Sequence, residues 1–155
     1  MIQLRPGDLI AVRKDGAYFL FAILTKQILF GGHWSLAFHG ARPGPPSAQD
    51  EVAGPGFHAI VDFIIPKREG RVVVVSRGND FSSLQGPELL QQPPLLNLAP
   101  NYRIYRWKDG LREKAEYLHF TPSPTPEERS APHYSCTQAD IVCDLAQEGG
   151  KSRNQ

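Results

Sequence analysis

The feature that most constrains the fold is the segment 6–25, in which two apolar runs flank the dipeptide Asp15-Gly16. Asp-Gly between two β-prone runs favours a type I′ turn, because both central residues of that turn need a positive φ. The second run, residues 18–24, carries bulky side chains at both parities, so we expect it to be covered on both faces. The sequence therefore predicts a hairpin in the middle of a core.

A second hairpin is predicted between residues 57 and 76. Residues 57–65 are almost entirely apolar and end at Pro66, so they have the composition of a strand. Residues 71–76 include four consecutive valines, which favour a strand because β-branched side chains fit a pleated, buried surface. We expect these two segments to pair antiparallel across a turn at residues 67–70.

Shorter strands are predicted on either side of this hairpin. Residues 27–30 and 33–38 are expected to form two strands, with the glycine pair between them as a turn or bulge. Residues 102–107 alternate between two faces, and residues 111–116 are expected to pair back on them across a second Asp-Gly turn.

Proline and glycine interrupt the remaining segments. Residues 40–56 hold four prolines and are expected to form a long loop with only a turn of helix near 47–52. Residues 78–92 are expected to be irregular as well, apart from a short helix near 87–91. Two stretches of this length are long enough to carry function.

The C-terminal segment contains a predicted helix. Thr137 and Asp140 have the spacing of a capping box, which predicts a short helix that ends at Gly149-Gly150. Residues 149–155 are predicted to be a flexible tail. The sequence thus predicts one β-dominated α+β domain over 1–148, built on a strongly bent antiparallel sheet or a small barrel with a short C-terminal helix.

Charge and cysteine content narrow the functional classes. The 155 residues include 17 basic and 16 acidic side chains, a net charge of +1, so nothing favours a nucleic acid or a membrane surface as partner. The N-terminus has no apolar leader, and no run reaches the roughly 18–20 apolar residues of a membrane span. Cys136 and Cys143 make no disulfide framework. We expect a cytoplasmic protein.

The sequence contains no pattern typical of a catalytic or metal centre. Its five histidines are scattered, and none belongs to an H-E-x-x-H helix. His133 and Cys136 stand in an H-x-x-C relation, but a tetrahedral zinc site needs a second pair, which His119 and Cys143 alone could supply. We therefore expect no metal, no cofactor and no enzymatic activity.

Two other functional classes stay open. Residues 102–107 interleave aromatic and basic side chains, as in a small β-barrel interaction module or a module that binds single-stranded nucleic acid. The near-neutral charge instead favours one face in the core and one mildly basic face. The contacts of such a module would be Tyr102, Arg103, Tyr105 and Arg106. The other open class is a hydrolase built on His33 or His58.

Several turns and strands between residues 4 and 114 occur in a distinctive order. The first are Gly7-Asp8, the apolar run to Val12, Asp15-Gly16 with Tyr18 after it, and Ile23-Leu24. The later ones are Gly70-Arg71 with a hydrophobic strand, Pro93-Pro94, and Asp109-Gly110. This order resembles the immunity protein 26 family of bacterial polymorphic-toxin systems. The chain departs from the family pattern at Phe21-Ala22 and Val72, where Gly-Arg and tryptophan are usual.

The resemblance implies a cytoplasmic protein that neutralises a cognate toxin by direct, stoichiometric binding. Such a protein needs a rigid scaffold and a complementary surface, with aromatic and arginine side chains as anchors. We expect residues 40–56 and 78–92 to supply much of the toxin-facing surface, because these stretches can vary independently. The candidate toxin-binding residues in or beside irregular segments are Trp34, Asp50, Glu51, Phe57, Asp80, Phe81, Arg106 and Trp107.

Overall fold

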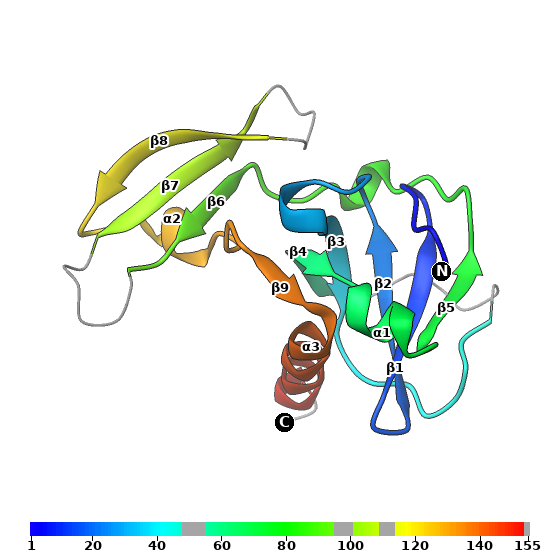
Figure 1. The fold of residues 1–155 in the computed structure, drawn as a ribbon. Coiled ribbons are helices and arrows are strands. Elements are labelled where there is room, and N and C mark those ends of the chain that lie inside the picture. Colours follow the sequence, from blue (N-terminus) through cyan, green and yellow to red (C-terminus); the bar gives the residue numbers. More distant parts are fainter. Residues whose placement is uncertain (48–54, 95–100, 109–113, 154–155) are drawn as a thin grey trace.

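The computed structural model of the protein describes residues 1–47, 55–94, 101–108 and 114–153. Within these residues, nine strands form two sheets (Figure 1). The six-stranded main sheet has the order β5-β1-β2-β3-β4-β9, and the three-stranded second sheet has the order β6-β7-β8. Neighbouring strands are antiparallel except for β4 and β9, which are parallel. The predicted β-dominated α+β class is confirmed, with a main sheet that does not close into a barrel.

The elements have the following bounds. The strands of the main sheet are β1 (Leu9–Lys14), β2 (Ala17–Ile23), β3 (His33–Phe38), β4 (Gly56–Asp62), β5 (Val72–Ser76) and β9 (Cys136–Gln138). The strands of the second sheet are β6 (Leu89–Gln92), β7 (Tyr102–Trp107) and β8 (Ala115–Thr121). The helices are α1 (Ile64–Arg68), α2 (Pro126–Ser130) and α3 (Ala139–Arg153), with two short 3-10 helices, η1 (Leu29–Gly31) and η2 (Ser82–Leu84).

The central hairpin is confirmed. Asp15 and Gly16 have φ values of 53° and 78°, as a type I′ turn requires, and they join β1 to β2. Strand β2 lies between β1 and β3, with Phe21 in one buried cluster and its neighbours Leu20 and Ala22 in the other. The hairpin is therefore the shared wall of two cores.

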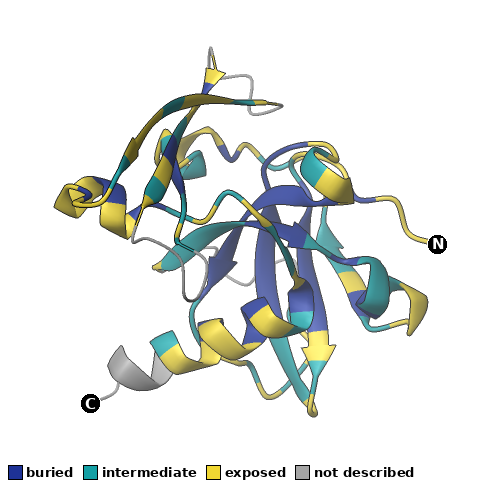
Figure 2. Ribbon diagram, turned by 60° about the vertical axis from the view of Figure 1, so that its left-hand side comes forward, coloured by how far each residue is buried: buried dark blue, intermediate teal, exposed yellow. Residues whose placement is uncertain are grey.

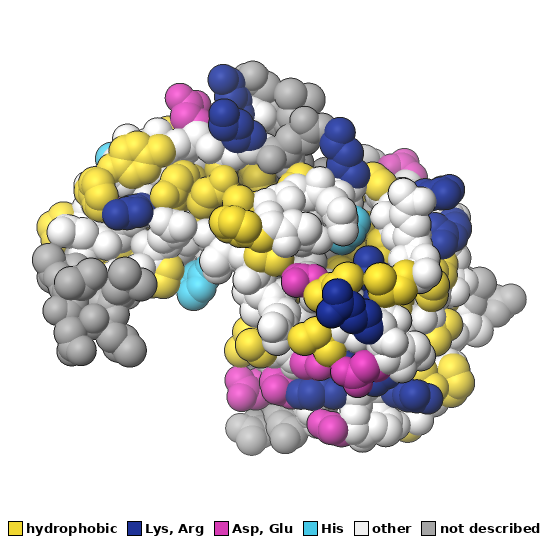
Figure 3. Space-filling model, in the orientation of Figure 1, with side chains coloured by type: hydrophobic (Ala, Val, Ile, Leu, Met, Phe, Trp, Pro, Cys, Tyr) yellow, Lys and Arg dark blue, Asp and Glu magenta, His cyan; other side chains and the backbone are white. Residues whose placement is uncertain are grey.

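The strands in the middle of the main sheet are largely buried (Figure 2), and alternate residues of β1 and β2 belong to different clusters, so the two clusters cover opposite faces of the sheet. The first cluster includes Phe21, Phe63 before α1, and Cys143 in α3. The second cluster lies between the sheets, where the ring centroids of Trp34 and Trp107 are 5.2 Å apart. Beyond this contact the second sheet projects from the main sheet, and Figure 3 shows the surface hollowed between them.

The second predicted hairpin is wrong. Strand β4 ends at Asp62, whose Oδ1 accepts a hydrogen bond from the backbone N–H of Ile64 at 2.9 Å, and the chain continues into α1. Strand β5 then pairs with β1, with Val72 opposite Val12, at the far edge of the sheet from β4. The apolar residues after Asp62 thus form a helix over the first cluster and not the end of a strand.

Three other predicted elements differ from the structure. Residues 27–30 are not a strand, because η1 lies there, and residues 87–91 are not a helix, because β6 lies there. Helix α3 continues past Gly149-Gly150 to Arg153. Strand β8 does pair back on β7, although it begins later than predicted. The predicted helical turn near 47–52 and the turn at Asp109-Gly110 fall on residues that the structure does not describe.

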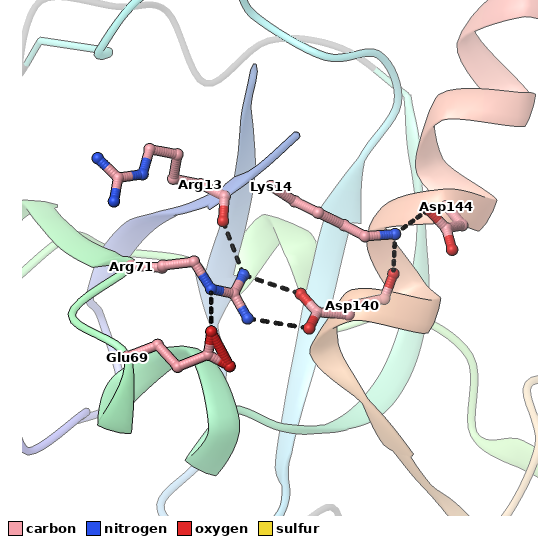
Figure 4. Close-up of polar contacts among 6 residues, drawn as sticks. All are labelled: Arg13, Lys14, Glu69, Arg71, Asp140 and Asp144. Carbon is pink, nitrogen blue, oxygen red and sulfur yellow. Dashed lines mark hydrogen bonds and ion pairs between the residues drawn. The ribbon is translucent and has the colours of Figure 1, made fainter. Parts of the chain in front are cut away.

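A network of charged side chains holds the first turns of α3 against β1 (Figure 4). The guanidinium of Arg71 donates to both carboxylate oxygens of Asp140, at 3.0 and 2.9 Å, and to the backbone oxygen of Arg13 at 2.7 Å. Lys14 donates to the backbone oxygen of Asp140 at 3.3 Å and pairs with Asp144. The network fixes the helix over the first cluster.

We expect the protein to lose stability as the pH falls below about 6.5, the usual pKa of histidine. His33 is buried, its Nδ1 donates to the backbone oxygen of Thr25 at 2.9 Å, and burial lowers the pKa of its ring. The unfolded chain therefore binds a proton more readily than the folded one, so this contribution is complete above the unfolded pKa and falls with decreasing pH. Urea denaturation at several pH values measures the free energy of unfolding of the protein and of His33→Asn, which keeps a donor for Thr25. An equal dependence of this free energy on pH in both proteins would contradict the prediction.

Candidate interaction surface

An irregularity in the pairing of β7 with β8 determines which side chains share a face. The register shifts between Ile104 and Tyr105, which leaves Leu118 of β8 as the extra residue of a β-bulge. Residues three positions apart on a regular strand point to opposite faces. Because of the bulge, Tyr117 and Phe120 point to the same face.

Aromatic side chains follow one another along this face. The ring centroid of Tyr105 is 4.5 Å from that of Tyr134 and 5.8 Å from that of Tyr117, and the rings of Tyr117 and Phe120 are 5.6 Å apart. The guanidinium carbon of Arg103 lies 5.2 Å from the centre of the Phe120 ring. We call Arg103, Tyr105, Tyr117, Phe120 and Tyr134 the aromatic strip. At its outer end, 47 % of Tyr117 and 54 % of Phe120 are exposed.

The inner end of the aromatic strip is attached to the core. Trp107 lies 6.4 Å from Tyr134 and 5.2 Å from the fully buried Trp34, so a series of rings leads from the core to the surface. The hydroxyl of Tyr105 donates to Oε1 of Gln92 at 2.9 Å, and Nε2 of Gln92 donates to the backbone oxygen of Tyr134 at 3.3 Å. These contacts orient the strip without any partner.

Helix α2 lies against the opposite face of the second sheet. Buried Gln91 of β6 donates from Nε2 to the backbone oxygen of Arg129 at 2.6 Å. Nε2 of His119 lies 2.8 Å from Oε2 of Glu128, which also closes a capping box with Thr125. The hydrogen bond from the backbone N–H of Thr125 lowers the pKa of Glu128. The sheet that carries the aromatic strip is thus supported from behind.

A pocket of about 590 Å³ lies where η1 and β9 face the second sheet. It is lined by Leu29, Phe30, Asp62, Gln92, Tyr134, Ser135, Cys136 and Gln138. We call it the junction pocket. It shares Tyr134 with the aromatic strip, so the pocket and the strip form one continuous surface.

Phe30 on the rim of the junction pocket has an unusual conformation. Its φ of 52° and ψ of 30° place a bulky residue in the left-handed region, and 83 % of the residue is exposed. A strained residue of this kind persists only where its surroundings hold it, and such residues are frequent at binding sites. We include Phe30 in the candidate surface because of both its backbone conformation and its exposure.

Three of the predicted contact residues are buried and do not offer an exposed contact. Trp34, Phe81 and Trp107 belong to the second cluster, where they pack the second sheet and its neighbouring segments on the main sheet. Phe57 is half-buried and packs beside the first cluster. These four side chains stabilise the fold by packing.

The other predicted contact residues lie away from the aromatic strip or outside the described part of the chain. Arg106 is exposed but shares its face of β7 with Ile104, opposite the strip. Asp80 is exposed, and its Oδ1 accepts a hydrogen bond from the N–H of Ser82 at 3.0 Å, which lowers its pKa. Asp50 and Glu51 are among the residues that the structure does not describe.

The outer residues of the candidate surface were not found from the sequence. Phe30, Tyr117, Phe120 and Tyr134 belong to three different segments. The one available signal was the high β-propensity of residues 117–120, which indicates a strand but not which side chains are exposed. For Tyr105 and Arg103, the sequence predicts a contact only in the nucleic-acid alternative.

His33, His58 and Cys143 lie in surroundings that support the fold and not a reaction. The hydroxyl of Ser35 donates to the backbone oxygen of His33 at 3.0 Å, so the two side chains do not form a nucleophile–base pair. His58 lies with Nε2 2.6 Å from the backbone oxygen of Leu84. Burial raises the pKa of Cys143 to about 12. Within the described ranges, no group of three or more His, Cys, Asp or Glu side chains could hold a metal ion.

Comparisons with protein-family models, with curated proteins and with solved structures find no match for this chain. In the part of the chain that the structure describes, no helix combines the length and the apolar character needed to cross a membrane.

Proposed function

We propose that the protein neutralises a toxin by binding it directly and stoichiometrically, with the aromatic strip as the contact surface. The function is the one implied by the resemblance to the immunity protein 26 family. The observation that supports the choice of surface is the exposed pair Tyr117 and Phe120, with the guanidinium of Arg103 over one ring. Tyrosine and arginine are enriched among residues that dominate binding energy, and charged residues are depleted at interface centres.

Two further properties support this proposal. The strip is ordered by its own ring contacts and by Gln92, so little conformational freedom is lost on binding. Cys136 and Cys143 are free thiols, which is typical of proteins that act in the reducing cytoplasm. We therefore propose that the protein acts in the cytoplasm, where it would meet an incoming toxin.

The double variant Tyr117→Ala, Phe120→Ala is expected to weaken toxin binding about 100-fold. Truncation of one hot-spot aromatic costs about 2 kcal/mol of binding free energy, and the losses at two neighbouring rings add incompletely. Its free energy of unfolding should change by less than about 1 kcal/mol, since both residues are exposed. The measurement is growth of cells that co-express a toxin from the neighbouring reading frame, should that frame encode one, together with calorimetric titration of the purified toxin domain.

The matched control is Val73→Ala, Ile141→Ala, which removes exposed apolar side chains from β5 and α3 instead. This control should protect cells as the unaltered protein does. Full protection by the strip variant, or equal loss of protection in both variants, would contradict the proposed surface.

A second candidate function is binding of single-stranded nucleic acid. The placement of Arg103 over Phe120, beside Tyr117, favours it, because stacked rings and arginines form the platforms of such proteins. Gel-shift titration with single-stranded oligonucleotides decides between the two functions. Binding that weakens with added salt and requires Phe120 would support this function, whereas no binding at low salt would exclude it.

A further inference from the structure

The junction pocket has the size and charge of a site for a cationic group. Its volume of about 590 Å³ is within the range of ligand pockets, about 300–1,000 Å³. Asp62 is the one charged residue among the eight that line it. Oδ1 of Asp62 accepts the hydrogen bond from Ile64, while Oδ2 has no hydrogen-bond partner among the described residues. The wall therefore offers an unused carboxylate oxygen.

The aromatic residues in the wall narrow the choice of cation. Phe30 and Tyr134 line the same pocket as Asp62, and a cation gains free energy over the face of an aromatic ring. A guanidinium is planar, stacks on rings and donates parallel N–H groups to a carboxylate, whereas an ammonium is compact and more strongly hydrated. A pocket lined by one carboxylate and two aromatic side chains thus suits arginine better than lysine.

We propose that the junction pocket receives the side chain of an arginine from the partner protein. The identification of the partner as a protein rests on the proposed function. The preference of the pocket for a guanidinium does not depend on that function. Because Tyr134 belongs to both the pocket and the aromatic strip, the arginine lies beside the apolar contact surface. Charge recognition in the pocket then fixes the register in which the partner meets the strip.

The test uses the isolated protein and a small probe. In amide-resolved NMR titrations, N-acetyl-arginine amide is expected to shift the backbone signals of Asp62 and Gln138, which pair in β4 and β9. The citrulline counterpart has nearly the same shape without the charge, and it should bind about tenfold more weakly. Equal shifts with both probes, or no shift with either, would overturn the assignment.

Two variants keep the test independent of folding. In Asp62→Asn the side-chain oxygen can still accept from Ile64, so the fold should persist while the response to arginine disappears. In Phe30→Gly the positive φ becomes favourable, so the free energy of unfolding should be unchanged or higher while the response weakens. An arginine response that survives Asp62→Asn in the folded protein would refute the proposal.

This experiment and the toxin experiment fail separately. The titrations contain no toxin, so a missing arginine response removes the pocket proposal and leaves the aromatic strip as the contact surface. Conversely, if the unaltered protein does not protect cells, the proposed function is removed even where the pocket binds arginine amide, whereas full protection by the strip variant removes only the aromatic strip as the contact surface.

Discussion

Replacing Trp34 by alanine is expected to lower the free energy of unfolding by about 4 kcal/mol. Trp34 is fully buried, stacks on His58 with ring centroids 5.3 Å apart, and contacts Trp107 edge to face. Its Nε1 also donates to the backbone oxygen of Gln85 at 3.1 Å. The substitution therefore leaves a large cavity where the two sheets meet, and it removes the donor of that hydrogen bond. Urea denaturation followed by circular dichroism measures the loss.

A loss of this size is a large part of the 5–15 kcal/mol that stabilises an ordinary domain, so a milder substitution at the same position is measured beside it. Trp34→Phe keeps a ring at the contact with Trp107 and should cost only about 2 kcal/mol. Phe120→Ala, an exposed aromatic on β8, should cost less than about 1 kcal/mol. Comparable losses in Trp34→Phe and Phe120→Ala would contradict a structural role for Trp34 at the junction of the sheets.

The second large effect is expected at the contact of Arg71 with Asp140. Arg71→Ala should lower the free energy of unfolding by about 2 kcal/mol, because two charge-assisted hydrogen bonds to one carboxylate are lost. The backbone oxygen of Arg13 loses its donor as well. The side chain of Arg71 is only 15 % exposed, so water replaces these partners incompletely. Chemical denaturation at low and high salt provides the measurement.

A double-mutant cycle assigns the effect to the pair. Arg71→Ala and Asp140→Ala, alone and combined, should give a coupling free energy of about 1–2 kcal/mol. Arg71→Lys keeps the charge but cannot bind both oxygens in parallel, so it should recover only part of the loss. Additive effects of the two alanine substitutions would mean that the Arg71–Asp140 pair does not hold the start of α3.

The central hairpin could be predicted because the residues that specify it are adjacent in the sequence. Asp15-Gly16 alone favours the turn, and the apolar residues at both parities of β2 require cover on both faces. No distant contact is needed for either inference. The same holds for β7, whose alternation is visible within six residues.

The second hairpin could not be predicted correctly because the same apolar residues suit a helix that packs on the sheet. Phe63 meets Phe21 edge to face with ring centroids 5.1 Å apart, and that contact exists only in the folded chain. Asp62 then supplies a side-chain acceptor for the start of α1. Tertiary packing thus decided between two local conformations that the sequence favours almost equally.

The candidate surface was beyond sequence reasoning for a different reason. The shared face of Tyr117 and Phe120 depends on a bulge at Leu118, and a strand pattern with period two assigns them to opposite faces. Tyr134 reaches the strip through a separate segment, by its contacts with Tyr105 and Gln92. Conversely, the tryptophans that looked like anchors are buried because large aromatics also fill cores.

Hydrogen exchange of the purified complex with the toxin domain tests the proposed function most directly. The complex should form with one toxin domain per chain, and the backbone amides of β7 and β8 should exchange more slowly in it than in the free protein. Amides of β5, at the far edge of the main sheet, should exchange at the same rate in both states. Protection confined to β5 or α3, with β8 unchanged, would contradict the aromatic strip as the contact surface, and the absence of any complex would contradict neutralisation by binding.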